Sequence, residues 1–144
     1  MAVEVFISFN GNCRDAVEFY AKVFRTEKPE IMTFADMPAG PEEFPFAEEA
    51  KKLVMYTRLN INGSTVMFSD VPPGMPFVAG SNISLTIGSK SMDEIKLWFN
   101  ELKEGGTVVM ELQETFWSKY YGFITDKFGI LWQFNYDSGQ MEVK

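Results

Sequence analysis

Two stretches of the sequence, residues 6–20 and 85–99, repeat the same order of structural signals. Each contains an apolar run typical of a β-strand, then a polar break, the start of a helix and an aromatic pair, which is Phe19-Tyr20 in the first stretch and Trp98-Phe99 in the second. The pattern predicts one βαβββ module in each half, and such a unit is too small to cover both faces of its own sheet. We predict an α+β fold in which two βαβββ modules pair curved mixed sheets around a shared cavity.

Periodicity and turn chemistry give the remaining elements. Asn62-Gly63 is typical of a two-residue hairpin turn. Ser91 and Glu94 form a capping box that begins a helix, and Asn12 and Asp15 are placed to cap an earlier one. These signals predict helices over 13–24 and from 91 to the glycines at 105–106, and strands over 3–9, 30–34, 53–61, 64–69, 83–87, 108–112, 123–125 and 130–134.

The prolines and the acidic stretches set the expected boundaries. We expect a single domain over residues 1–137, with module one at about 1–70, a Pro-rich linker at 71–81 and module two at about 82–137. Residues 138–144 are expected to form a C-terminal tail. The acidic stretch 36–49 belongs to a long predicted loop that is a candidate lid.

The aromatic stretch 115–136 carries one polar residue that bears on function. Strand alternation places Gln133 on the face shared with Leu131 and Asn135, opposite the face of Trp132 and Phe134. A polar side chain on a face that is otherwise partly apolar usually lines a cavity or makes a hydrogen bond inside one.

The charge and the rarest residue types narrow the possible functions. The net charge of −7 disfavours a nucleic-acid backbone as partner and suits a cationic small molecule. The absence of histidine excludes imidazole bases and His-ligated metals. The single cysteine excludes an internal disulfide and fits a reducing compartment. No signal peptide or membrane-spanning run is evident, so we expect a cytoplasmic protein that binds neither nucleic acid nor membrane.

Four segments resemble the vicinal oxygen chelate superfamily, which contains glyoxalase I, bleomycin-resistance proteins and extradiol dioxygenases, and within it the PhnB-like family. The segments are FISFNGNCRDAVEFYAKVF, RLNINGSTVMFSD, the GG after the second helix, and TFWSKYYGFITDKFGILWQFN. The resemblance covers residues 3–136 and implies the glyoxalase/bleomycin-resistance fold and a homodimer. PhnB-like proteins are often labelled as ubiquinone-pathway methyltransferases. This chain has no Gly-rich strand-to-helix motif for a methyl donor, so we do not adopt that label.

The resemblance also implies where a divalent metal would be bound in metal-dependent relatives. The matching positions fall near Val5, near Met67, near Asn82 or Ser84, and at Gln133, while Tyr56 stands where many PhnB-like chains have histidine. An amide, a thioether and a valine do not make a site for zinc, nickel or iron. We therefore expect no metal and no cofactor.

Two groups of side chains are candidates for ligand binding. Tyr56, Arg58 and Asn60 share one strand face, where a guanidinium could clamp an acidic group, although a solvated edge strand is an equal alternative. Gln133 with Trp117 and Tyr121 could form a pocket wall, although core packing is the commoner role of such aromatics. The ligand-binding set that we predict is Tyr56, Arg58, Met67, Asn82, Trp117, Tyr121 and Gln133.

Cys13 lies in the first turn of the first predicted helix, where the helix dipole lowers the pKa of a thiol. Without a neighbouring histidine or second cysteine, a packing or capping role is favoured over reactivity.

Two functions of different classes remain. The favoured hypothesis is a metal-free, homodimeric module that binds a small organic ligand of cationic or drug-like character. The alternative is a glyoxalase- or dioxygenase-type lyase, isomerase or oxidoreductase with a non-standard metal site built around Gln133. The sequence leaves open whether the protein is an enzyme.

Overall fold

The computed structural model describes residues 3–36 and 50–137 of the chain. The chain divides into two compact units, Met1–Val78 and Ala79–Lys144, called here the N-terminal and C-terminal units. The division falls inside the predicted linker at 71–81. The predicted tail at 138–144, and all of the predicted acidic loop except Asp36, lie outside the described residues.

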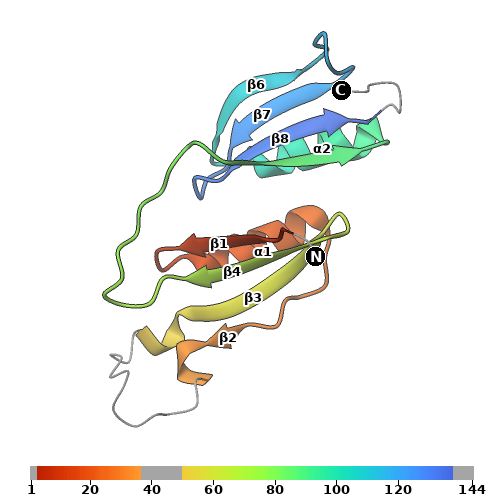
Figure 1. Ribbon diagram of the computed structural model, residues 1–144. Helices are drawn as coiled ribbons and strands as arrows, with labels where there is room; N and C mark the ends of the chain where they lie inside the picture. The colour runs from red at the N-terminus through yellow and green to blue at the C-terminus, as the bar shows by residue number, and fades with distance from the viewer. Residues whose placement is uncertain (1–2, 37–49, 138–144) are drawn as a thin grey trace. The chain divides into compact units, whose positions relative to one another are not determined.

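The described residues of the N-terminal unit include one α-helix and a four-stranded mixed sheet (Figure 1). The strand order is β1-β4-β3-β2, with β1 parallel to β4 and the other neighbours antiparallel. Its elements are β1 (Val5–Phe9), α1 (Cys13–Phe24), β2 (Met32–Thr33), the short 3₁₀ helices η1 (Phe34–Asp36) and η2 (Ala50–Lys52), β3 (Val54–Ile61) and β4 (Ser64–Asp70).

The C-terminal unit repeats this topology. Its sheet has the order β5-β8-β7-β6, with β5 parallel to β8 and the other neighbours antiparallel. Its elements are β5 (Ser84–Ser89), α2 (Met92–Leu102), β6 (Thr107–Gln113), β7 (Tyr121–Thr125) and β8 (Leu131–Tyr136). The predicted α+β fold with two βαβββ modules is confirmed. Apart from the short β2, each strand end lies within two residues of its prediction.

Each helix covers one face of the sheet in its own unit (Figure 1). In the N-terminal unit, fully buried Tyr20 of α1 stacks on Phe68 of β4 with ring centroids 5.8 Å apart. In the C-terminal unit, Phe99 of α2 meets Phe134 of β8 edge-on at 5.4 Å. Gly122 permits this contact, because a Cβ at that position would lie 2.9 Å from the Phe99 ring. The opposite face of each sheet, called here the helix-free face, carries the candidate site residues.

The start of α1 differs from the prediction. Neither Asn12 nor Asp15 makes a side-chain hydrogen bond to the helix start among the described residues. Instead Asp70, the last residue of β4, accepts hydrogen bonds at Oδ1 from the backbone N–H groups of Gly11 (2.9 Å) and Cys13 (3.0 Å). The capping prediction was wrong because the acceptor comes from a residue distant in sequence.

No helix in the described parts of the chain combines the length and the apolar character needed to cross a membrane.

Candidate functional site

On the helix-free face of the N-terminal sheet, a row of side chains runs across three strands. The register pairs Phe6 of β1 with Met67 of β4, and Met67 in turn with Arg58 of β3. Tyr56 lies two residues before Arg58 on the same face, and its ring centroid is 6.4 Å from that of Phe6. Met67 therefore lies between an aromatic and a cationic neighbour.

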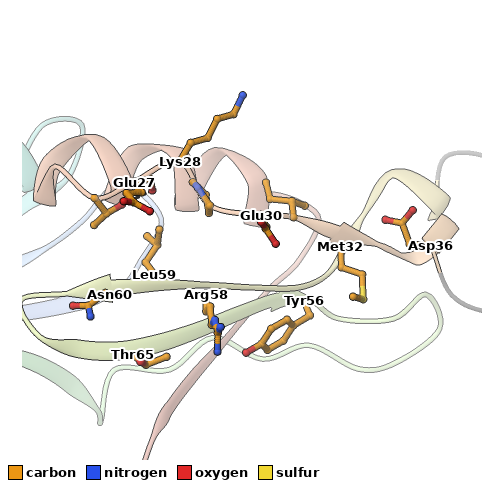
Figure 2. A pocket seen from close by; sticks show the side chains of 13 residues that line it. Glu27, Lys28, Glu30, Met32, Asp36, Tyr56, Arg58, Leu59, Asn60 and Thr65 are labelled. Carbon is orange, nitrogen blue, oxygen red and sulfur yellow. Dashed lines mark hydrogen bonds between the residues drawn. The ribbon is translucent and has the colours of Figure 1, made fainter.

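A groove of about 1040 Å³ lies along the outer edge of this sheet (Figure 2). Tyr56, Arg58 and Asn60 of β3 line it together with Thr65 of β4. The other wall is the segment 26–32, which leads from α1 into β2, and Asp36. The sequence predicted the three β3 residues but not the second wall, because a coil segment without periodicity gives no signal of what it faces.

The polar groups of the groove differ in whether they already make hydrogen bonds within the protein. Asn60 accepts a hydrogen bond from the backbone N–H of Gly63 (2.9 Å), so its side-chain oxygen stabilises the hairpin turn. Asp36 accepts hydrogen bonds from both the backbone and the hydroxyl of Thr33. Arg58 is exposed and has no ion-pair or hydrogen-bond partner among residues 3–36 and 50–137. Its guanidinium is thus a group that a ligand could engage.

On the helix-free face of the C-terminal sheet, three polar side chains form a chain of hydrogen bonds. The Tyr121 hydroxyl donates to Gln133 Oε1, and Gln133 Nε2 donates to Ser84 Oγ (2.7 Å). The Trp117 ring meets the Tyr121 ring edge-on, with centroids 5.3 Å apart. Burial raises the pKa of Tyr121, so its hydroxyl stays protonated and can donate at neutral pH.

The structure resolves two ambiguous positions of the sequence. Asn82 is exposed and precedes β5, whereas Ser84 begins β5 and contacts Gln133. Val5 pairs with buried Val66 and so lies on the helix-covered face. Of the predicted set, Tyr56, Arg58 and Met67 lie on the helix-free face of the N-terminal sheet, and Tyr121 and Gln133 lie on that of the C-terminal sheet beside Trp117.

The residues at these positions do not fit a transition metal. Met67 offers a thioether between Phe6 and Arg58, and both polar ends of the Gln133 amide are engaged by Tyr121 and Ser84. Zinc, nickel and iron prefer imidazole, thiolate or carboxylate ligands. Within residues 3–36 and 50–137, no group of three or more His, Cys, Asp or Glu side chains lies close enough together to hold a metal ion.

Cys13 is fully buried at the start of α1. Burial, with a smaller contribution from the nearby Asp70 carboxylate, raises the pKa of its thiol to about 12. The shift is opposite to the one expected from the helix dipole, because desolvation of the thiolate outweighs it. The thiol is protonated at neutral pH and packs in the core.

Comparison with known proteins identifies relatives along the whole chain. Residues 2–135 match the model of a family described as 3-demethylubiquinone-9 3-methyltransferase. Protein YjdN of Escherichia coli (strain K12) is 32% identical over 143 residues, which cover 94% of this chain and 95% of YjdN.

Relatives are also found among solved structures. Protein PA1353 from Pseudomonas aeruginosa has a TM-score of 0.82 at 31% identity, covering 94% of this chain and 97% of PA1353. A PhnB protein from Bacillus cereus, described as a putative 3-demethylubiquinone-9 3-methyltransferase, has a TM-score of 0.71 at 25% identity, covering 94% and 99%. The fosfomycin resistance protein FosX from Listeria monocytogenes, at 9% identity and a TM-score of 0.60 over 94% and 92% of the two chains, shares the fold alone.

Proposed function

The chain belongs to the 3-demethylubiquinone-9 3-methyltransferase family, which includes PhnB proteins, and on this premise we propose that it is a metal-free module that binds a small organic ligand. The family name carries a methyl-transfer activity that we do not extend to this chain. The turn before α1 contains the single Gly11, and the turn before α2 is Lys90-Ser91. Neither is the Gly-rich strand-to-helix loop that a methyl donor of the usual kind requires.

The observation that carries the proposal is the hydrogen-bonded chain Tyr121–Gln133–Ser84 on a sheet face without a helix. Small-molecule sites are lined mainly by apolar and aromatic side chains, together with a few polar groups held in fixed positions. Trp117 supplies that ring. Gln133, which stands where the family resemblance implies a metal ligand, is held by the neutral Tyr121 and Ser84 side chains, and this arrangement suits recognition of an organic group.

The groove of the N-terminal unit is a separate candidate site, and its charges favour a ligand of cationic or drug-like character there. Glu27, Glu30 and Asp36 contribute carboxylates to its lining, and the chain as a whole is acidic. Negative potential attracts cationic molecules and raises their local concentration. Arg58 in the same groove would receive an acidic substituent on such a ligand.

The proposal includes a homodimer in the cytoplasm. The family resemblance supports the dimer. A fully buried, reduced Cys13 as the only cysteine supports a reducing compartment.

A thermal-shift screen of small organic cations, zwitterions and neutral aromatics tests the proposal. A ligand at 100 times its Kd stabilises the folded state by about 2.7 kcal/mol, and we expect at least one compound to raise Tm by several degrees. Gln133→Leu should abolish that increase, because it removes the hydrogen bonds of Gln133 to Tyr121 and to Ser84. Val109→Thr, on the exposed side of β6, should preserve it and serves as the control. If no compound raises Tm, the binding function is wrong.

A further inference from the structure

This inference rests on the proposed function and concerns Asn135, two residues beyond Gln133 on β8. Alternation along the strand places both side chains on the helix-free face, opposite buried Trp132 and Phe134. The Asn135 Oδ1 atom is buried and has no hydrogen-bond partner in the described part of the chain. Buried acceptors in native proteins almost always have a donor, so the unpaired Asn135 Oδ1 requires an explanation.

The neighbours across the sheet explain why no residue of this face satisfies the atom. The register places Asn135 between Gly88 of β5 and Tyr121 of β7. Gly88 is exposed and has no side chain, and a Cβ there would meet only the backbone oxygen of Asn135, at 3.4 Å, so the layer of side chains has a gap over Gly88. The Tyr121 hydroxyl, the nearest side-chain donor by register, is already bonded to Gln133 Oε1. The acceptor therefore lies beside a gap, and its two cross-strand neighbours do not fill its hydrogen-bonding capacity.

We propose that Asn135 Oδ1 accepts a hydrogen bond from the ligand, so that this site selects molecules with an N–H donor such as an amide, amine or amidinium. A carbonyl oxygen can only accept, and a carboxylate ligand would bring a second acceptor to it. Because Asn135 Oδ1 is buried, the donor reaches it over Gly88 only after the covering side chains move aside, and the rings of Tyr121 and Trp117 provide an apolar surface for a flat body attached to it. The acidity of the chain favours a positively charged donor over a neutral one.

Three isosteric probes test this selection on the full-length protein: benzamidine, benzamide and benzoate. They share a phenyl ring and differ in the group presented, which is a cationic donor, a neutral donor and acceptor, or an anionic acceptor. Isothermal titration calorimetry should rank benzamidine first and benzoate last, with at least about a tenfold difference in Kd between them, the scale of a hydrogen bond gained against an acceptor left unpaired.

Two variants at Asn135 and a matched control sharpen the test. Asn135→Leu should weaken benzamidine binding about tenfold and leave the Tm of the free protein unchanged or higher, because it removes an unpaired buried acceptor of similar volume. Asn135→Asp should tighten benzamidine binding and abolish any benzoate binding, since it turns the acceptor into an anion. Asn100→Leu on the exposed side of α2 should change neither.

Each contrary result separates this inference from the proposed function. If Asn135→Leu lowers Tm and leaves benzamidine binding unchanged, the oxygen is satisfied by an internal water and the inference is wrong. If benzoate binds as tightly as benzamidine, the donor preference is wrong while ligand binding stands. If none of the three probes binds, the inference is also wrong, and the broad thermal-shift screen alone decides the proposed function.

Discussion

The two units begin their helices in different ways although their topologies match. In the C-terminal unit the cap is local: Ser91 Oγ accepts a hydrogen bond from the backbone N–H of Glu94 (3.2 Å), and the Glu94 carboxylate accepts one from Ser89 Oγ (2.8 Å). In the N-terminal unit the cap comes from Asp70, which is 59 residues from Gly11 in the sequence. The free backbone N–H groups at the start of α2 are capped by residues close in sequence, whereas those at the start of α1 are capped by the last residue of a distant strand.

Equivalent backbone hydrogen bonds show which residues of the two units correspond. The residue after β4, Val71, donates its N–H to Phe9 of β1, and the residue after β8, Asp137, donates its N–H to Ser89 of β5. Tyr136 thus occupies the position of Asp70, and it carries no carboxylate. The C-terminal unit has its own buried carboxylate, Asp126, but this one serves the β7–β8 hairpin.

The N-terminal unit therefore depends on the long-range polar contacts of Asp70. Asp70 is 2% exposed, and besides capping α1 it accepts at Oδ2 the backbone N–H of Val54 (2.9 Å) at the start of β3. A single carboxylate thus joins the end of β4 to the beginnings of α1 and β3. Asp126 accepts hydrogen bonds from Phe128, Ile130 and Trp132, which follow it by two, four and six positions.

The largest effect is expected from Asp70→Asn. The substitution keeps the shape but removes the charge and replaces one acceptor with a donor facing a backbone N–H, so it should lower the free energy of unfolding by about 2–4 kcal/mol. Hydrogen exchange should show faster exchange at Gly11, Cys13 and Val54, while β7 and β8 keep their protection. If exchange accelerates equally in both units, the carboxylate does not act locally on the N-terminal unit.

Asp126→Asn should have a smaller effect, about 1.5–3 kcal/mol, because hydrogen bonds to a charged acceptor are lost within a single hairpin. Trp132 donates its indole N–H to Asp126 Oδ2 (2.9 Å), so its fluorescence reports the change directly. We expect altered emission in urea-free buffer and unchanged exchange at the start of α1. A loss of stability exceeding that of Asp70→Asn would contradict the comparison.

Ser91→Ala should cost about 1 kcal/mol of stability, the usual value for removing an N-cap side chain. Asn12→Ala is the matched change in the other unit, and we expect it to be nearly neutral because Asn12 makes no side-chain capping bond. Urea unfolding of both variants measures the contrast. Equal losses for the two would mean that Asn12 caps α1 in solution.

An effect confined to alkaline pH concerns the first residue of each helix, which is the titratable Cys13 in α1 and Met92 in α2. The raised pKa of Cys13 means that between pH 9.0 and about 12 the folded thiol keeps a proton that the unfolded chain loses. Stability should therefore fall as pH rises above 9, by about 1 kcal/mol at pH 10. Melting curves of Cys13→Ala should show a shallower decline over pH 8–10, although the variant is less stable at pH 7. Parallel curves would contradict the burial of the thiol.

Features fixed by local pattern could be predicted from the sequence. The hairpin at Asn62-Gly63 has both residues at positive φ (50° and 89°), as this turn requires. The period of two along β8 correctly separated Gln133 from Trp132 and Phe134, because burial on one face leaves a strong signal.

Features fixed by pairing between distant strands could not be predicted. Asp70 is the last residue of predicted module one and lies shortly before two prolines, and nothing local shows that it reaches α1. The choice between Asn82 and Ser84 as neighbour of Gln133 needed the β5–β8 register, since a slip of two keeps the same face. The orphan oxygen of Asn135 likewise depends on Gly88 and Tyr121 being its neighbours.

Native mass spectrometry of the protein as purified, without added metal or chelator, distinguishes a bound organic ligand from a bound metal. We expect a dimer whose mass contains no metal ion, with an organic adduct that is retained by Val109→Thr and lost in Gln133→Leu. A stoichiometric divalent metal that survives buffer exchange and disappears in Gln133→Leu would contradict this expectation. That result would mean that Gln133 is a metal ligand and that the Tyr121–Gln133–Ser84 hydrogen bonds rearrange to release its oxygen.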